Sequence, residues 1–143
     1  MDHQDFTFDS DSFRKQLGIR KIDVEGATRG LLNLAEHWET LGRERLAGIV
    51  SISSDAGENK IYGDVLGKKF SLRYAAFAME GDGALEAVLT TQDLVTGKDV
   101  ELSRFLVSGE GDILSMSGEK ILEIEYRDTP LKSLFAIVKY VMG

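Results

Sequence analysis

The chain has 143 residues, 24 of them acidic and 17 basic, with a formal charge of −7 and no cysteine. This length is typical of one domain with a core of its own, and the missing cysteines exclude disulfides, thiolate catalysis and cysteine metal sites. The acidic balance, without any evident basic run, argues against a nucleic-acid partner. No apolar stretch approaches the roughly 20 residues of a membrane span, and the acidic start is unlike a secretion signal. We expect a single cytoplasmic domain over residues 1–143, without a membrane partner or a cofactor.

The first third of the chain predicts helices. Residues 1–9 are polar apart from Phe6 and Phe8, a pattern typical of either an edge strand or a mobile arm. A short helix is expected to begin at residue 10 or 11 and to end at Gly18, because glycine commonly terminates helices. A longer helix is predicted over residues 23–41 with Gly42 as its stop. Its apolar stripe would pack on a sheet and consists of Ala27, Leu31, Leu34, Ala35 and Trp38.

Strands follow. The side chains of residues 45–54 predict a long strand, with apolar residues on both of its faces. A second strand is expected near 60–66. From 70 to 126, short segments rich in Val, Leu, Ile, Phe, Tyr and Thr alternate with glycine turns. This pattern is typical of consecutive antiparallel hairpins, because glycine tolerates the positive φ of tight turns.

Folding the hairpins about these turns predicts their register. The first turn would set Ala76 opposite Ala87, and the second would set Leu89 opposite Leu106. The resulting apolar face is expected to collect Phe70, Leu72, Tyr74, Ala76, Leu85, Ala87, Leu89, Val100, Leu102, Leu106, Ile113, Leu122, Ile124 and Tyr126. A slip of one residue in any hairpin would destroy this separation of faces.

The chain ends in a predicted helix, which Thr129 caps and Pro130 begins. The fold class is therefore α+β: one antiparallel meander sheet of six or seven strands, with one face covered by an N-terminal and a C-terminal helix. This order of elements is similar in outline to helix-grip ligand-binding domains and to some small acidic bacterial inhibitor or immunity proteins. Both likenesses concern topology, and a fold does not determine a function.

Catalytic chemistry is scarce in the sequence. The two histidines, His3 and His37, are too few for a typical zinc site, and no carboxylate pair is placed for acid–base work. The glycine-rich turns open no helix and lack the lysine of a phosphate loop. We therefore expect no enzymatic activity, no metal and no catalytic residue.

One polar row interrupts the predicted apolar face. Arg104 would lie between Leu102 and Leu106, with Thr91 and Ser115 as its cross-strand neighbours. Asp93 would lie diagonally across on the same face. A buried guanidinium must be paired, so the row predicts either an internal ion pair or an arginine that reaches out at the sheet margin. The alternative is a helix–sheet cavity in which Arg104, Thr91, Ser115 and Asp93 bind a small amphiphilic anion.

A second feature is an apolar patch on the face predicted to be wet. It consists of Phe77, Val88, Phe105, Val107, Leu114, Met116 and Ile121. The patch is expected either to be covered by another segment or to dock a protein. With the acidic charge and the missing catalytic groups, it favours a small protein-binding module that acts on a basic partner, such as an inhibitor, a chaperone or an immunity-type protein. The sequence leaves open whether the chain forms a homodimer.

Overall fold

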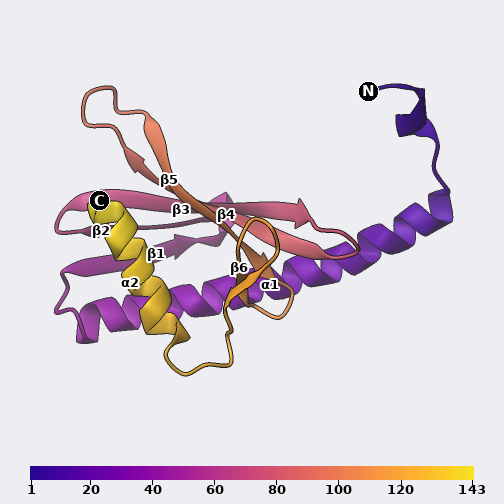
Figure 1. Ribbon diagram of the computed structural model, residues 1–143. Helices are drawn as coiled ribbons and strands as arrows, with labels where there is room; N and C mark the ends of the chain where they lie inside the picture. Colours follow the sequence, from indigo (N-terminus) through magenta and orange to yellow (C-terminus); the bar gives the residue numbers. More distant parts are fainter.

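The computed structural model describes residues 1–143 and confirms the α+β class (Figure 1). Seven antiparallel strands follow one another in the order of the chain and form a sheet curled as a half-barrel. Two helices contribute side chains to the core on one face of this sheet. The elements are η1 (His3–Phe6), α1 (Ser10–Glu44), β1 (Val50–Asp55), η2 (Ala56–Glu58), β2 (Lys60–Val65), β3 (Lys68–Ala78), β4 (Gly83–Gln92), β5 (Asp99–Ser108), β6 (Ile113–Leu114), β7 (Lys120–Leu122) and α2 (Thr129–Met142). No helix is long and apolar enough to span a membrane.

The N-terminal third is one helix, where two were predicted. α1 runs for 35 residues and continues through both Gly18 and Gly42. A single glycine in a helix interior costs only about 1 kcal/mol relative to alanine, which good helix formers on both sides can offset. The helix is capped by Asp9, whose carboxylate accepts hydrogen bonds from the backbone N–H groups of Asp11 and Ser12. Residues 1–9 form no edge strand; they contain the exposed single turn η1.

The first strand is shorter than predicted. β1 begins at Val50, five residues after the expected start. Ala47 and Gly48 have φ values of 50° and 76°, so the chain reverses here from α1 into the sheet. Gly42 contacts this reversal closely, since a Cβ on it would lie 2.4 Å from the carbonyl oxygen of Val50. The reversal uses the residues that were predicted to extend the strand.

The β3–β4 hairpin keeps its predicted faces although its register differs. Ala76 lies opposite Leu85 and not opposite Ala87, a slip of two residues. The turn is tight, with the N–H of Met79 donating to the carbonyl of Asp82. Because side chains alternate with a period of two, this slip leaves Phe70, Leu72 and Tyr74 buried as predicted.

A β-bulge reverses the faces of the next hairpin. Thr90 pairs with Glu101, whereas Leu89 pairs with Ser103, so Leu102 is one extra residue on β5. Beyond this point every β5 side chain points to the face opposite to the predicted one. Arg104 lies opposite Val88 on the outer face, and Val107 enters the core beside Leu85. The predicted placement of Arg104 on the apolar face is therefore wrong.

The core lies between the two helices and the concave face of the sheet. Trp38 is its largest fully buried side chain and donates a 2.9 Å hydrogen bond from Nε1 to Ser133 Oγ, which joins α1 to α2. α1 also lies very close to the β5–β6 turn. A Cβ on Gly26 would lie 2.4 Å from the carbonyl oxygen of Gly109, and one on Gly30 would lie 2.8 Å from Gly111 Cα.

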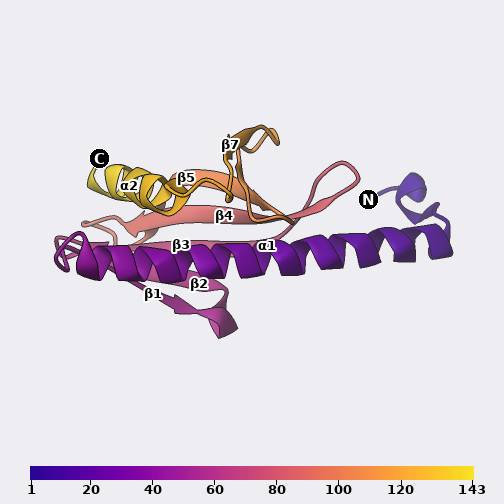
Figure 2. The same ribbon diagram turned by 90° about the horizontal axis from the view of Figure 1, so that it is seen from below.

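The N-terminal part of α1 extends beyond the sheet, as Figure 2 shows. The end of the sheet is marked by Gly83, whose N–H donates to the Asp23 carboxylate and whose Cα lies against the backbone of Arg20. We call residues 1–22 the arm. Every residue of the arm is exposed except Arg20, which is half-buried.

Candidate functional site

The arm carries a series of exposed large apolar side chains. Its large apolar side chains are each between 46% and 68% exposed, apart from the fully exposed Met1; they are Phe6, Phe8, Phe13, Leu17, Ile19 and Ile22. The rings of Phe8 and Phe13 pack against each other with their centroids 5.7 Å apart. Single exposed apolar residues are ordinary on protein surfaces, but such a group on one projecting segment indicates an interaction site.

Part of this surface continues the stripe that α1 uses to pack on the sheet. Phe13 and Leu17 are one turn apart, and Val24, Ala27 and Leu31 follow at helical spacing on the same side. Ala27 and Leu31 are fully buried against the sheet, whereas Phe13 and Leu17 are about half exposed. The same apolar stripe is thus core at one end of the helix, whereas at the other end, where the Phe8 ring packs against Phe13, it stays about half exposed.

The arm contains four acidic and four basic residues, but the acidic ones lie in residues 1–11 and the basic ones follow them. Residues 12–22 contain Arg14, Lys15, Arg20 and Lys21 and no acidic residue, in a chain whose formal charge is −7. Lys21 lies 3.8 Å from Glu25, and both side chains are more than half exposed, so this pair contributes little. A surface that receives residues 12–22 therefore fits best when it is apolar at its centre and acidic at its rim.

Arg104 is paired on the outer face of the sheet. Its guanidinium bonds the carboxylates of Glu101 and Glu86. The hydrogen bond from Arg104 lowers the pKa of Glu101, so this contribution to stability is present at neutral pH and lost as the pH falls through the lowered pKa. The exposed pair resembles the predicted arginine at the sheet margin more than the predicted internal pair.

The other members of the predicted polar row lie apart. The Thr91 hydroxyl donates to the Lys69 carbonyl at 2.9 Å. Asp93 accepts from the N–H groups of Thr96 and Val95 within its own turn, and these bonds lower its pKa. The structure does not bring Thr91 or Asp93 to Arg104. Ser115 and Arg104 both line an apolar cavity beside α2, which is described below. The Ser115 hydroxyl forms hydrogen bonds with Ser117 Oγ and with the N–H of Glu119.

The predicted apolar patch is likewise divided. The bulge turns Val107 into the core, where Phe105 also packs against buried residues. Leu114 is only 5% exposed, and Phe77 and Val88 are half-buried. Met116 and Ile121 remain exposed, but they lie at the rim of a cavity beside α2. These seven residues do not form one exposed surface; whether any of them docks a protein stays a prediction.

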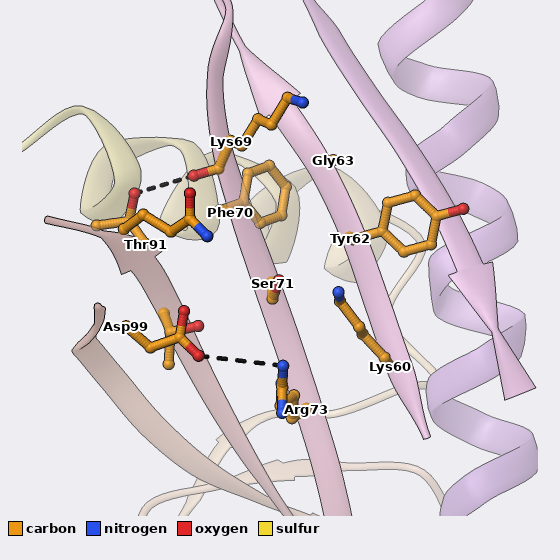
Figure 3. A pocket seen from close by; sticks show the side chains of 11 residues that line it. Lys60, Tyr62, Gly63, Lys69, Phe70, Ser71, Arg73, Thr91 and Asp99 are labelled. Atoms are coloured by element: carbon orange, nitrogen blue, oxygen red, sulfur yellow. Dashed lines mark hydrogen bonds and ion pairs between the residues drawn. The ribbon is translucent and has the colours of Figure 1, made fainter. Parts of the chain in front are cut away.

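A polar hollow of about 190 Å³ lies beside β2, β3 and β4 (Figure 3). Lys60 lies directly opposite Arg73 across β2–β3, an unfavourable pairing of like charges. The sequence does not predict this cluster, because residues 60 and 73 meet only through the β2–β3 register. Lys60 Nζ lies 5.4 Å from the centre of the Tyr62 ring and Arg73 lies 4.0 Å from Asp99, and a third cation, Lys69, also lines the hollow. Because only two of its 11 lining residues are hydrophobic, the hollow offers little apolar surface to a ligand, and we consider it a weaker candidate than the arm.

A larger and mainly apolar cavity lies between α2 and strands β4 to β7. Its volume is about 340 Å³, and ten of its 14 lining residues are hydrophobic. Trp38 and Leu89 line it from the core, while Met116, Ile121 and Tyr140 line it where they are also exposed to solvent. Arg104 and Ser115 belong to its lining, whereas Thr91 and Asp93 do not.

Comparison with protein-family models, with curated proteins and with solved structures finds no match to this chain.

Proposed function

We propose that this protein is a protein-binding module and that the arm is its binding element. The observation that carries this proposal is the apolar stripe of α1, which is buried at Ala27 and Leu31 and about half exposed at Phe13 and Leu17. Folded proteins rarely leave contiguous apolar surface exposed unless another molecule covers it. Inhibitor, chaperone and immunity-type functions all fit such a module.

The arm suits binding of a helix in a groove. In this mode an amphipathic helix presents apolar anchors at helical spacing to a hydrophobic groove. Phe13 and Leu17 have this spacing, and full burial of a Phe or Leu side chain contributes about 1.5–3 kcal/mol. α1 already holds these residues in a helix, so the partner need not supply the free energy of ordering them.

The basic charge of residues 12–22 narrows the class of partner protein that we expect. The overall charge of −7 favours a basic partner, but the four basic residues of 12–22 favour an acidic rim around the groove. A second copy of this acidic chain also meets this description. A crosslinking experiment on the arm can therefore identify either a second copy of this chain or a different, acidic protein.

Site-specific photo-crosslinking tests the proposal. A benzophenone amino acid at Leu17 is expected to crosslink in cells to one defined protein, or to a second copy of the chain. The control places the same probe at Glu36, which is exposed on the same helix outside the arm. Equal crosslinking from both positions would contradict a specific role of the arm.

The crosslinked protein is then purified and titrated against the wild type and the Phe13→Ser/Leu17→Ser variant. The double variant is expected to raise the Kd about 100-fold or more, because truncating an anchor of this kind typically costs 2 kcal/mol or more. Its thermal unfolding should stay close to that of the wild type, since both side chains are exposed in the free protein. An unchanged Kd would refute the arm as the binding element.

A further inference from the structure

The cavity between α2 and the sheet is the candidate ligand site outside the arm. Its volume of about 340 Å³ lies within the range of small-molecule sites, which are typically 300–1,000 Å³ and mostly apolar. α2 contributes the small residues Ser133 and Ala136 to its wall, where larger apolar side chains would fill the space. Met116 is 39% and Ile121 is 57% exposed at the rim, so the space is reached from solvent.

The polar groups around the cavity determine what it can hold. Ser133 Oγ accepts from Trp38 and donates to the Thr129 carbonyl, and the Ser115 hydroxyl is bonded to its neighbours. The guanidinium of Arg104 is held by Glu101 and Glu86 on the outer face. The hydroxyls of Ser103 and Tyr140 have no hydrogen-bond partner within the chain, so they remain available to a ligand.

We propose that this cavity binds a small uncharged apolar molecule that carries at most one or two hydrogen-bonding groups. A carboxylate or phosphate placed here would lose its hydration without gaining a free cation, which is costly, whereas an aliphatic or aromatic body gains from burial. The ligand class therefore differs from the anion that the sequence suggested around Arg104. The cavity is separate from the arm, so this proposal stands independently of the proposed function.

A neutral fluorescent probe, N-phenyl-1-naphthylamine, tests the site. Its fluorescence is expected to rise saturably on binding and to be displaced by 1-dodecanol. Dodecanoate has the same chain length but a charged head, and it should displace the probe at least about tenfold less effectively, because its head would be desolvated without a partner. Equal displacement by the two compounds would overturn the assignment to uncharged ligands, and an absence of saturable binding would overturn the site.

Two filling variants locate the binding. Ala136→Phe fills the cavity from α2 and Ser103→Phe fills it from β5, so the test does not depend on one variant folding. Each is expected to raise the probe Kd about tenfold or more, since the ligand would have to displace a packed ring. Lys139→Phe is the matched control, because residue 139 lies on α2 outside the cavity and should leave the Kd unchanged.

The arm variant Phe13→Ser/Leu17→Ser completes the test. It should bind the probe like the wild type, because neither residue lines the cavity. Loss of probe binding in this variant, or unchanged binding in both filling variants, would place the probe elsewhere and refute the proposal. Neither result depends on the protein partner of the arm.

Discussion

Trp38→Ala is expected to lower the free energy of unfolding by about 3–5 kcal/mol, the usual cost of removing a buried Trp or Phe side chain. Trp38 is 1% exposed and belongs to the core cluster that both helices and the sheet share. The substitution would leave a cavity and would also remove the hydrogen bond to Ser133 Oγ. Urea unfolding followed by circular dichroism measures the effect.

The matched control for Trp38 is Phe13→Ala, a truncated aromatic on the same helix. Phe13 is 46% exposed and lies in the arm, so the free energy of unfolding should change by less than about 0.5 kcal/mol. The account of the core would be wrong if Trp38→Ala were as mild as this control. It would also be wrong if Phe13→Ala were as severe as Trp38→Ala, since the arm would then be packed.

Two glycine substitutions on α1 are expected to change the free energy of unfolding in opposite directions. Gly26→Ala should destabilise the protein by about 1–3 kcal/mol, because the new Cβ would lie 2.4 Å from the carbonyl oxygen of Gly109 and force α1 away from the β5–β6 turn. Gly18→Ala should stabilise it by about 0.5–1 kcal/mol, because no atom lies within 4 Å of the new Cβ and alanine is the better helix former.

Thermal and urea unfolding of the two glycine variants measure this difference. The comparison holds the substitution and the helix constant and changes only the surroundings. Stabilisation by both variants would show that α1 does not approach the β5–β6 turn as closely as described. Destabilisation by both would show that the arm is packed against something at Gly18.

The meander and its two covering helices followed from local patterns. Glycine turns at positions 81, 97, 111 and 118, all with positive φ, separate segments of period two. The predicted buried faces of β3 and β4 are correct although the predicted register is not, because the register differs by two residues and side chains alternate with a period of two. Alternation is therefore a more robust guide to the buried face than the register of a particular turn.

The faces of β5 could not be predicted in the same way. One extra residue at Leu102 reverses every later side chain, and no glycine in β5 marks the bulge. Such a bulge depends on tertiary packing, since it lets both Leu102 and Val107 contact the core. A prediction without the bulge places Arg104 among apolar residues, and the predicted polar row depends on that placement.

The arm was missed for a different reason. Gly18 was interpreted as the end of a helix, which separated Phe13 and Leu17 from the stripe at Ala27 and Leu31. The helical spacing across Gly18 was nevertheless present in the sequence and is the signal that indicates one continuous helix. What the sequence alone could not indicate is where the sheet ends, because that depends on the contact between Gly83 and Arg20.

The most direct test of the account is a distance along α1, because the arm is a binding element only if the helix runs straight past the sheet. Spin labels at Ser12→Cys and His37→Cys suit this measurement, since both residues are exposed and the chain has no cysteine of its own. The labels lie on the same side of the helix, and 25 residues at 1.5 Å each predict a separation of about 37 Å by pulsed electron paramagnetic resonance. A narrow distribution at this distance supports the projecting arm, whereas a markedly shorter distance would show a helix that breaks near Gly18 and folds back, and would contradict it.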